Sequence, residues 1–174
     1  MSIWNRFPPL AESTLGMAYF CARRFDAAME HIERNLETFP GHATNLVLLA
    51  LAYAAARQPE KAIEKCQEAL AVGGRAAIVR LHAAATYAKA GKTEEARRIL
   101  EDAETHWKPD GTSSCWIASV YACLGEKDAA FDWLERAFNE RASFMVFLKT
   151  HPLFVDLHGD PRFDDLVKRI GIPD

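Results

Sequence analysis

The sequence lacks an excess of charge of either sign, because 21 Lys and Arg residues face 24 Asp and Glu residues and leave a net charge of −3. Without a basic surplus, the chain has no means of displacing counterions from a nucleic acid or of holding an anionic membrane. It also lacks an apolar run of the roughly 18 residues that a membrane span needs, and its first residues do not form a secretory signal. We therefore expect a soluble, cytoplasmic protein that binds neither nucleic acid nor membrane.

Paired cysteines and catalytic motifs are missing as well. Cys21, Cys66, Cys115 and Cys123 form no C-x-x-C pair, and free thiols are typical of a reducing compartment. The sequence contains no Gly-rich phosphate loop, no G-x-S-x-G and no H-E-x-x-H. We expect no catalytic residues, no cofactor and no bound metal, and we predict that the protein is not an enzyme.

Tyrosine is scarce but regularly placed. The four tyrosines are Tyr19, Tyr53, Tyr87 and Tyr121, which recur with a constant 34-residue step. Small residues follow the same step, as helices that pack closely require: Gly16, Ala50, Ala84 and Ala118, and Ala28, Ala62, Ala96 and Ala130. Within each unit apolar residues recur at every third and fourth position, with a polar or Gly-containing break in the middle. Each unit is therefore predicted to be a helical hairpin.

These residues resemble the tetratricopeptide repeat, through Leu15-Gly16-x-x-Tyr19, Ala28-x-x-x-Ile32 and Pro40 of the first unit. The opening Trp of that pattern is absent from every unit. The resemblance implies an all-α, right-handed superhelical solenoid of four hairpins with a helical C-terminal cap. The boundaries predicted are an N-terminal arm or linker at 1–8, four units at 9–42, 43–76, 77–110 and 111–142, and capping helices at 143–174.

The C-terminal stretch is rich in acidic residues and histidine but has the features of a chain end. Asp160 is suited to cap a helix that starts at Pro161, and Phe163 and Leu166 begin one apolar stripe. The 34-residue period is expected to end before this stretch. The apolar run SFMVFLK (143–149) is predicted to be a helix that covers the open end of the fourth hairpin.

Residues 113–173 also resemble the terminal repeat and tail of bacterial signalling proteins, with the ending DPRFDDLVKRIG as the most characteristic part. In those proteins a tetratricopeptide array follows a kinase, a nucleotide cyclase or a winged-helix domain. The resemblance implies an adaptor, scaffold or sensor in a bacterial signalling or assembly system. No such catalytic or DNA-binding domain lies in this sequence, so we expect an isolated array or a free-standing relative.

Members of the family line their concave surface with the first helix of each hairpin, which implies a groove at the matching positions here. Those positions are mostly apolar and suit an amphipathic segment of a protein or peptide partner. The predicted groove residues are Ser13, Met17, Phe20, Val47, Leu51, Ala54, Leu81, Ala85, Lys89, Cys115, Ser119 and Ala122.

Several alternatives remain open at this stage. The groove residues could pack against neighbouring helices, or the groove could be filled by the N-terminal segment IWNRF or by a second copy of the chain. The groove or the end cap could serve as a homodimer interface. A hypothesis of another class is a metal-dependent enzyme that uses His151, Asp156 and His158.

Overall fold

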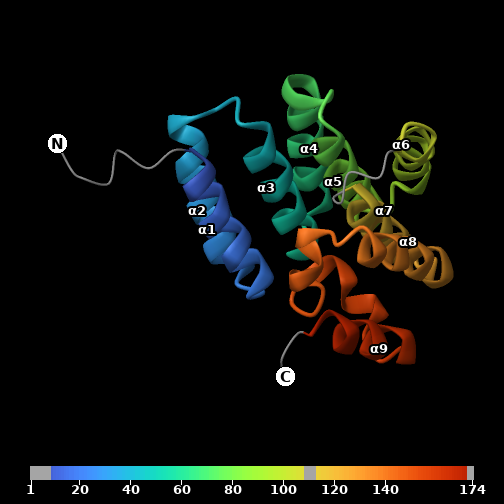
Figure 1. The fold of residues 1–174 in the computed structure, drawn as a ribbon. Helices are drawn as coiled ribbons and strands as arrows, with labels where there is room; N and C mark the ends of the chain where they lie inside the picture. Colours follow the sequence, from blue (N-terminus) through green and yellow to red (C-terminus); the bar gives the residue numbers. More distant parts are fainter. Residues whose placement is uncertain (1–8, 108–112, 172–174) are drawn as a thin grey trace.

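The computed structural model describes residues 9–107 and 113–171, and this part of the chain is all helical (Figure 1). The helices follow one another as hairpins joined by short turns. Their bounds are α1 Pro9–Cys21, α2 Phe25–Thr38, α3 Ala43–Ala55, α4 Pro59–Gly73, α5 Ala77–Lys89, α6 Thr93–Thr105, α7 Ser113–Leu124, α8 Lys127–Asn139, two 3-10 helices η2 Ser143–Phe147 and η3 Pro152–Leu157, and α9 Pro161–Ile170. The predicted N-terminal arm at 1–8 lies outside the described residues.

The hairpins stack in two rows. The first helices α1, α3, α5 and α7 each contact the next in the row, and each second helix contacts the first helix of the hairpin that follows it. Figure 1 shows this stepwise progression from the blue to the orange end of the chain. This arrangement is the all-α solenoid of four hairpins that the 34-residue period predicts.

The turn inside each hairpin explains why the period is kept so strictly. Its central residue has positive φ in every hairpin and is Arg23, Arg57, Gly91 or Gly125. The next backbone N–H then donates to the carbonyl of the repeated tyrosine, five residues back, at 2.8–3.0 Å. This is the Schellman closure of a helix C-terminus. A changed turn length would break this closure, so the turn fixes where each second helix begins.

Small residues occupy the contacts between helices. The seven alanines predicted for repeat packing have no solvent exposure, namely Ala28, Ala50, Ala62, Ala84, Ala96, Ala118 and Ala130. At Gly16 an added Cβ would lie 2.7 Å from Cγ1 of Ile32, so α1 and α2 approach too closely there for a side chain. The larger residues then fill one continuous core through the hairpins.

Two of the repeated tyrosines link neighbouring hairpins through their hydroxyl groups. The Tyr53 hydroxyl donates to Glu33 on α2, and the Tyr121 hydroxyl donates to Oε1 of Glu104 on α6 at 2.7 Å. Tyr53 and Tyr87 are buried, whereas Tyr19 and Tyr121 are half-buried. The rings of Tyr53 and Tyr121 therefore pack in the stack while their hydroxyl groups reach a carboxylate of the preceding hairpin.

The period continues beyond the fourth hairpin, contrary to the expectation that it ends there. The second helices begin at Phe25, Pro59, Thr93 and Lys127, and α9 begins at Pro161, which is the next position in the same series. The residue two positions before α9, Gly159, has positive φ like the matching residues of the regular turns. The helix α9 is therefore the second helix of a fifth unit, and it is preserved although the first helix of that unit is not.

The first half of this fifth unit forms η2 and η3 instead of a regular α-helix. Pro152 has no N–H to donate and disfavours α conformation in the residue before it. Accordingly His151 is extended, with φ −74° and ψ 124°. The segment 143–149, predicted to be a helix, is a 3-10 helix followed by a turn, and Pro152 prevents an α-helix from running on through His151.

The helix α9 closes the C-terminal end of the solenoid. The side chain of Asp160 accepts a hydrogen bond from the backbone N–H of Arg162, as expected for a cap, and Gly171 ends the helix at φ 79°. Phe163 and Leu166 are buried, while Arg169 pairs with Glu135 of α8 through two hydrogen bonds of 2.7 and 2.9 Å. The outer face of α9 is polar, as the last layer of a solenoid requires.

Candidate functional site

The segment Ser143–Leu157, here called the tail segment, lies against the row of first helices. The ring of His151 is 5.5 Å from Phe20 of α1 and 5.7 Å from Trp116 of α7, measured between ring centroids. Phe144 stacks on Trp116 at 4.0 Å. The tail segment therefore bridges the first and the last of these helices, and we call the surface that it covers the first-helix face.

Apolar burial holds the tail segment in place. Leu148, Leu153, Phe154 and Leu157 have no solvent exposure. Burying a leucine or phenylalanine side chain stabilises by about 1.5–3 kcal/mol. The tail segment thus contributes a set of side chains to the core although it contains no regular α-helix.

Few polar contacts accompany this burial. The ammonium of Lys89 on α5 lies 3.8 Å from a carboxylate oxygen of Asp156. The thiol of Cys123 on α7 lies 4.0 Å from the carbonyl oxygen of Leu153. Both distances are long for their kind of interaction, so the hold of the tail segment on the face is mainly apolar.

Two histidines are buried where the tail segment meets the face. Burial lowers the pKa of His151 to about 3, helped by the nearby His82 and Lys89. Burial likewise lowers the pKa of His82 to about 4, against the opposing effect of a hydrogen bond between its Nδ1 and the Ile78 carbonyl. Both rings are therefore neutral at pH 7, and a proton on either would be strongly disfavoured.

Two buried nitrogens beside them have no hydrogen-bond partner among the described residues, namely Nε2 of His151 and Nε1 of Trp116. Nδ1 of His151 accepts from the backbone N–H of Leu153 at 3.3 Å, so the neutral ring carries its proton on Nε2. Each buried, unpaired donor costs about 1–3 kcal/mol. The tail segment covers the face but does not satisfy its polar groups.

The structure does not have the open groove that the sequence predicts. Met17, Ala54 and Lys89 are half-buried. The other nine predicted groove residues are buried, namely Ser13, Phe20, Val47, Leu51, Leu81, Ala85, Cys115, Ser119 and Ala122.

Two causes account for this burial. Close packing of the hairpins buries some of these side chains between helices, as for Val47, which clusters with Ala69 of α4 and Val79 of α5. The tail segment covers others, as for Phe20 beside His151. The alternative in which the groove residues pack against neighbours is therefore correct for the first group. For the second group the occupant is the tail segment, which is part of the predicted C-terminal cap.

The sequence did carry a signal for this occupant. Apolar side chains recur in it at Phe144, Leu148, Phe154 and Leu157, and side chains of this kind need burial. Their separations of four, six and three residues do not keep to one helix face, and Pro152 interrupts the run.

The residues of the hypothetical metal site do not converge. His151 is buried against Phe20 and Trp116, whereas His158 is exposed and stacks on Phe163 at 4.6 Å, and Asp156 faces Lys89. Within residues 9–107 and 113–171, no three His, Cys, Asp or Glu side chains gather as metal ligands would.

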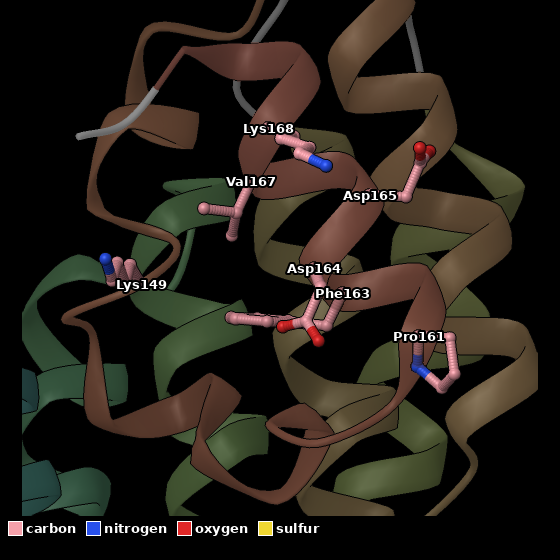
Figure 2. Close-up of a pocket in the computed structure, with 7 residues that line it drawn as sticks. All are labelled: Lys149, Pro161, Phe163, Asp164, Asp165, Val167 and Lys168. Carbon is pink, nitrogen blue, oxygen red and sulfur yellow. The ribbon is translucent and has the colours of Figure 1, made fainter. Parts of the chain in front are cut away.

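The acidic residues of α9 also serve separate purposes. A hollow of about 510 Å³ lies beside α9. Figure 2 shows that Asp164 and Asp165, which both line it, point to different sides of the helix. Asp165 pairs with Arg169 at 3.2 Å, one helical turn further on. The density of acidic residues in the sequence therefore reflects capping and surface pairing.

The cysteines are not activated as nucleophiles. Burial raises the pKa of Cys66, Cys115 and Cys123 to about 12, and that of Cys21 to about 11. A nucleophilic cysteine needs the opposite shift, towards the thiolate.

The stacked hairpins, the 34-residue step and the repeated turn geometry are those of a tetratricopeptide-repeat solenoid. Residues 21–103 match the family model described as "Anaphase-promoting complex, cyclosome, subunit 3". No curated protein sequence matches the chain.

A solved structure shows the same fold. PilF of Pseudomonas aeruginosa is similar with a TM-score of 0.58 and 20% identity, over 95% of this chain and 78% of that one. A crystal structure of MamA also matches, with a TM-score of 0.46 and 18% identity over 90% of both chains.

None of the described helices is both long enough and apolar enough to cross a membrane.

Proposed function

We propose that this chain is a non-catalytic protein-binding module whose first-helix face accepts an amphipathic segment of a protein or peptide. The observation that carries this proposal is that the face already holds a peptide of this kind, the tail segment, with Leu148, Leu153, Phe154 and Leu157 fully buried. A surface that takes up leucine and phenylalanine side chains from a largely non-helical segment has the chemistry of a peptide-binding groove.

The accessible edge of the face lies at the C-terminal ends of α3 and α5. A hollow of about 670 Å³ there is lined by Ala54, Ala55, Arg57, Pro59, Lys89, Ala90 and Gly91. Ala54 and Lys89 belong to the groove residues predicted from the sequence. We propose this edge as the place where a partner segment first makes contact, since its apolar and basic groups suit an amphipathic segment that carries acidic residues.

The resemblance of the C-terminal part to bacterial signalling proteins supports a role as adaptor, scaffold or sensor in a bacterial signalling or assembly system. The four free cysteines suit a cytoplasmic location. A scaffold role needs one accessible binding surface and no catalytic centre, and the edge described above supplies such a surface.

The test is capture of partners from a native bacterial lysate by the wild type, by Ala54→Glu at the edge, and by Ala71→Glu as a matched control. Ala71 is exposed on α4, so the control adds the same charge away from the edge. We expect cross-linking and mass spectrometry to find a partner segment at the edge that Ala54→Glu loses and Ala71→Glu keeps. A partner retained equally by all three proteins, or no partner at all, contradicts the proposal.

A further inference from the structure

We propose that the tail segment is a displaceable ligand in cis, so that the first-helix face is closed until a separate segment of similar chemistry replaces it. The inference depends on the proposed function, because it concerns the regulation of the same face. The expected competitor carries leucine or aromatic side chains at the spacing of Phe144, Leu148, Phe154 and Leu157, a nearby acidic residue and a free hydrogen-bond acceptor.

The first argument is that the tail segment fits the face incompletely. It buries Nε1 of Trp116 and its own Nε2 of His151 without an acceptor for either among the described residues. A competing segment that places a carbonyl or carboxylate oxygen near Trp116 would form a hydrogen bond that the tail segment cannot, and it would allow His151 to return to water. The competitor would therefore satisfy buried donors that the tail segment leaves without a hydrogen bond.

The second argument is the way in which the tail segment is attached at its two ends. Arg141, just before it, has a φ of 56°, which is unfavourable for a residue with a side chain. Gly159, just after it, also has positive φ. Between these turns, only η2 and η3 provide regular backbone hydrogen bonding. The tail segment is thus a loop with little regular backbone hydrogen bonding between α8 and α9, which contact each other independently of it.

That independence comes from direct contacts between α9 and α8. Arg169 binds Glu135 at 2.7 Å, and Nη1 of Arg162 binds Asp128 at 2.8 Å. Because neither pair involves the tail segment, α9 can stay on the solenoid while the tail segment leaves the face. The last helix then serves as an anchor for a loop that opens and closes.

The third argument is that hollows and exposed apolar side chains give access to the tail segment. Val146 and Phe147 in η2 have exposed fractions of 57% and 45%. A hollow of about 580 Å³ lies at the start of the tail segment, and its lining includes Arg141 of the turn after α8, Val146 of η2 and Ile170 of α9. A competitor can therefore engage the outer side of η2 before the buried leucines separate from the face.

The test uses a labelled synthetic peptide of residues 143–157 as the competitor and measures its binding to the full chain by fluorescence anisotropy. In Leu148→Glu a charge replaces a fully buried tail side chain, so the face should open. When a binding site is available only in a minor open form, the apparent affinity falls by the fraction that is open. We expect the peptide to bind Leu148→Glu at least tenfold more tightly than the wild type, and a scrambled peptide to show no such gain.

A milder variant guards against loss of folding in Leu148→Glu. In Asp156→Lys, repulsion from Lys89 replaces an attraction at the exposed side of the tail segment, with an expected gain of about two- to fivefold in peptide affinity, as for one surface ion pair. Asp164→Lys is its matched control, since Asp164 is exposed on α9, and it should bind as the wild type does. Emission of Trp116, assigned with Trp116→Phe, should shift to longer wavelength as the indole becomes exposed.

The outcomes separate this inference from the proposed function. If every tail-segment variant binds the peptide equally and Ala54→Glu still weakens binding, the face is a peptide site that the tail segment does not close. The further inference is then wrong, while the proposed function stands. If neither the wild type nor any folded variant binds the peptide, both proposals fall. If opening doubles the mass in solution, the ligand is the tail segment of a second copy, which overturns the assignment to a separate partner.

Discussion

The two halves of the fifth unit share one 34-residue register but have different structures. The second half, α9, begins one full repeat after α8 and packs on it as a regular helix. The first half should match α7 but forms η2 and η3 and lies on the first-helix face. A proline accompanies this difference in structure. Pro152 occupies the position at which the previous repeat has Ala118, and proline is unfavourable inside an α-helix.

The difference shows that the start of the second helix and the helical structure of the first half of a unit depend on different features of the repeat. The turn residue with positive φ recurs through Gly159 and fixes where the second helix starts. It does not require that the preceding residues be helical. The apolar side chains of the tail segment still need burial, and without a helix to present them they reach the nearest apolar surface, which is the row of first helices.

The largest effect should distinguish the regular hairpins from the tail segment, and it comes from a buried charge placed in each of these two regions. Leu51→Glu places a carboxylate at a site with no exposure in the centre of α3, where neighbouring helices leave no room to escape. We expect it to destabilise the protein by more than about 4 kcal/mol, as uncompensated buried charges do. Cooperative melting of the helical circular dichroism should be lost or fall steeply in temperature.

Leu148→Glu adds the same charge to an equally buried site of the tail segment. Here local release moves the carboxylate into water, so the hairpins should keep a cooperative melt and most of their helical signal. Equal destabilisation by the two variants would show that the tail segment belongs to the same cooperative unit as the hairpins, and the contrast between them would then be wrong.

Lowering the pH should also affect the tail segment and the regular hairpins differently. Burial lowers the pKa of His151 to about 3 and that of His82 to about 4, below the value of about 6.5 in an unfolded chain. The unfolded chain therefore binds more protons below pH 6.5, and stability falls as the pH falls from there towards the folded values. Each histidine should cost about 1.4 kcal/mol per pH unit in this range, measured by urea unfolding at pH 7.5, 6 and 5.

The tail segment should respond first, because release alone is enough to hydrate His151. The emission of Trp116 is expected to change at a higher pH than the loss of helical circular dichroism. His151→Gln should remove about half of the pH slope, whereas His106→Gln, whose ring is 73% exposed in the wild type, should leave it unchanged. An unaltered slope in His151→Gln would mean that His151 is already hydrated in solution.

The regular part of the fold could be predicted from local sequence, and the site could not. Tyr53 and Ala62 recur at fixed steps because each hairpin repeats the same contacts with its neighbours, so a local period carries the global fold. The tail segment belongs to no such period. Its partner Phe20 is separated from His151 by nearly the whole chain, and no local pattern encodes a contact over that distance.

The residues predicted for a groove were placed on the correct helices but in the wrong environment. Helix register decides which side of α5 carries Leu81 and Lys89, and the register follows from the sequence. Whether that side meets water depends on what else the chain can place there. His82 and Trp116, which lie 4.1 Å apart in the site, became recognisable as part of it only once the tail segment was located above them.

The smallest effect tests the shared turn. Arg57 occupies the same position as Gly91 but has a φ of 59°, and a residue with a side chain loses roughly 1–2 kcal/mol in this conformation. Arg57→Gly removes that strain but gives the unfolded chain more freedom, which offsets part of the gain. We expect a net stabilisation of about 0.5–1 kcal/mol in urea unfolding, with Gly91→Arg destabilising by a similar amount. Because the closure from Gln58 to the Tyr53 carbonyl is unchanged, the helical circular dichroism of the folded protein should not respond. A loss of stability in Arg57→Gly would mean that the arginine side chain stabilises the turn more than its backbone conformation costs.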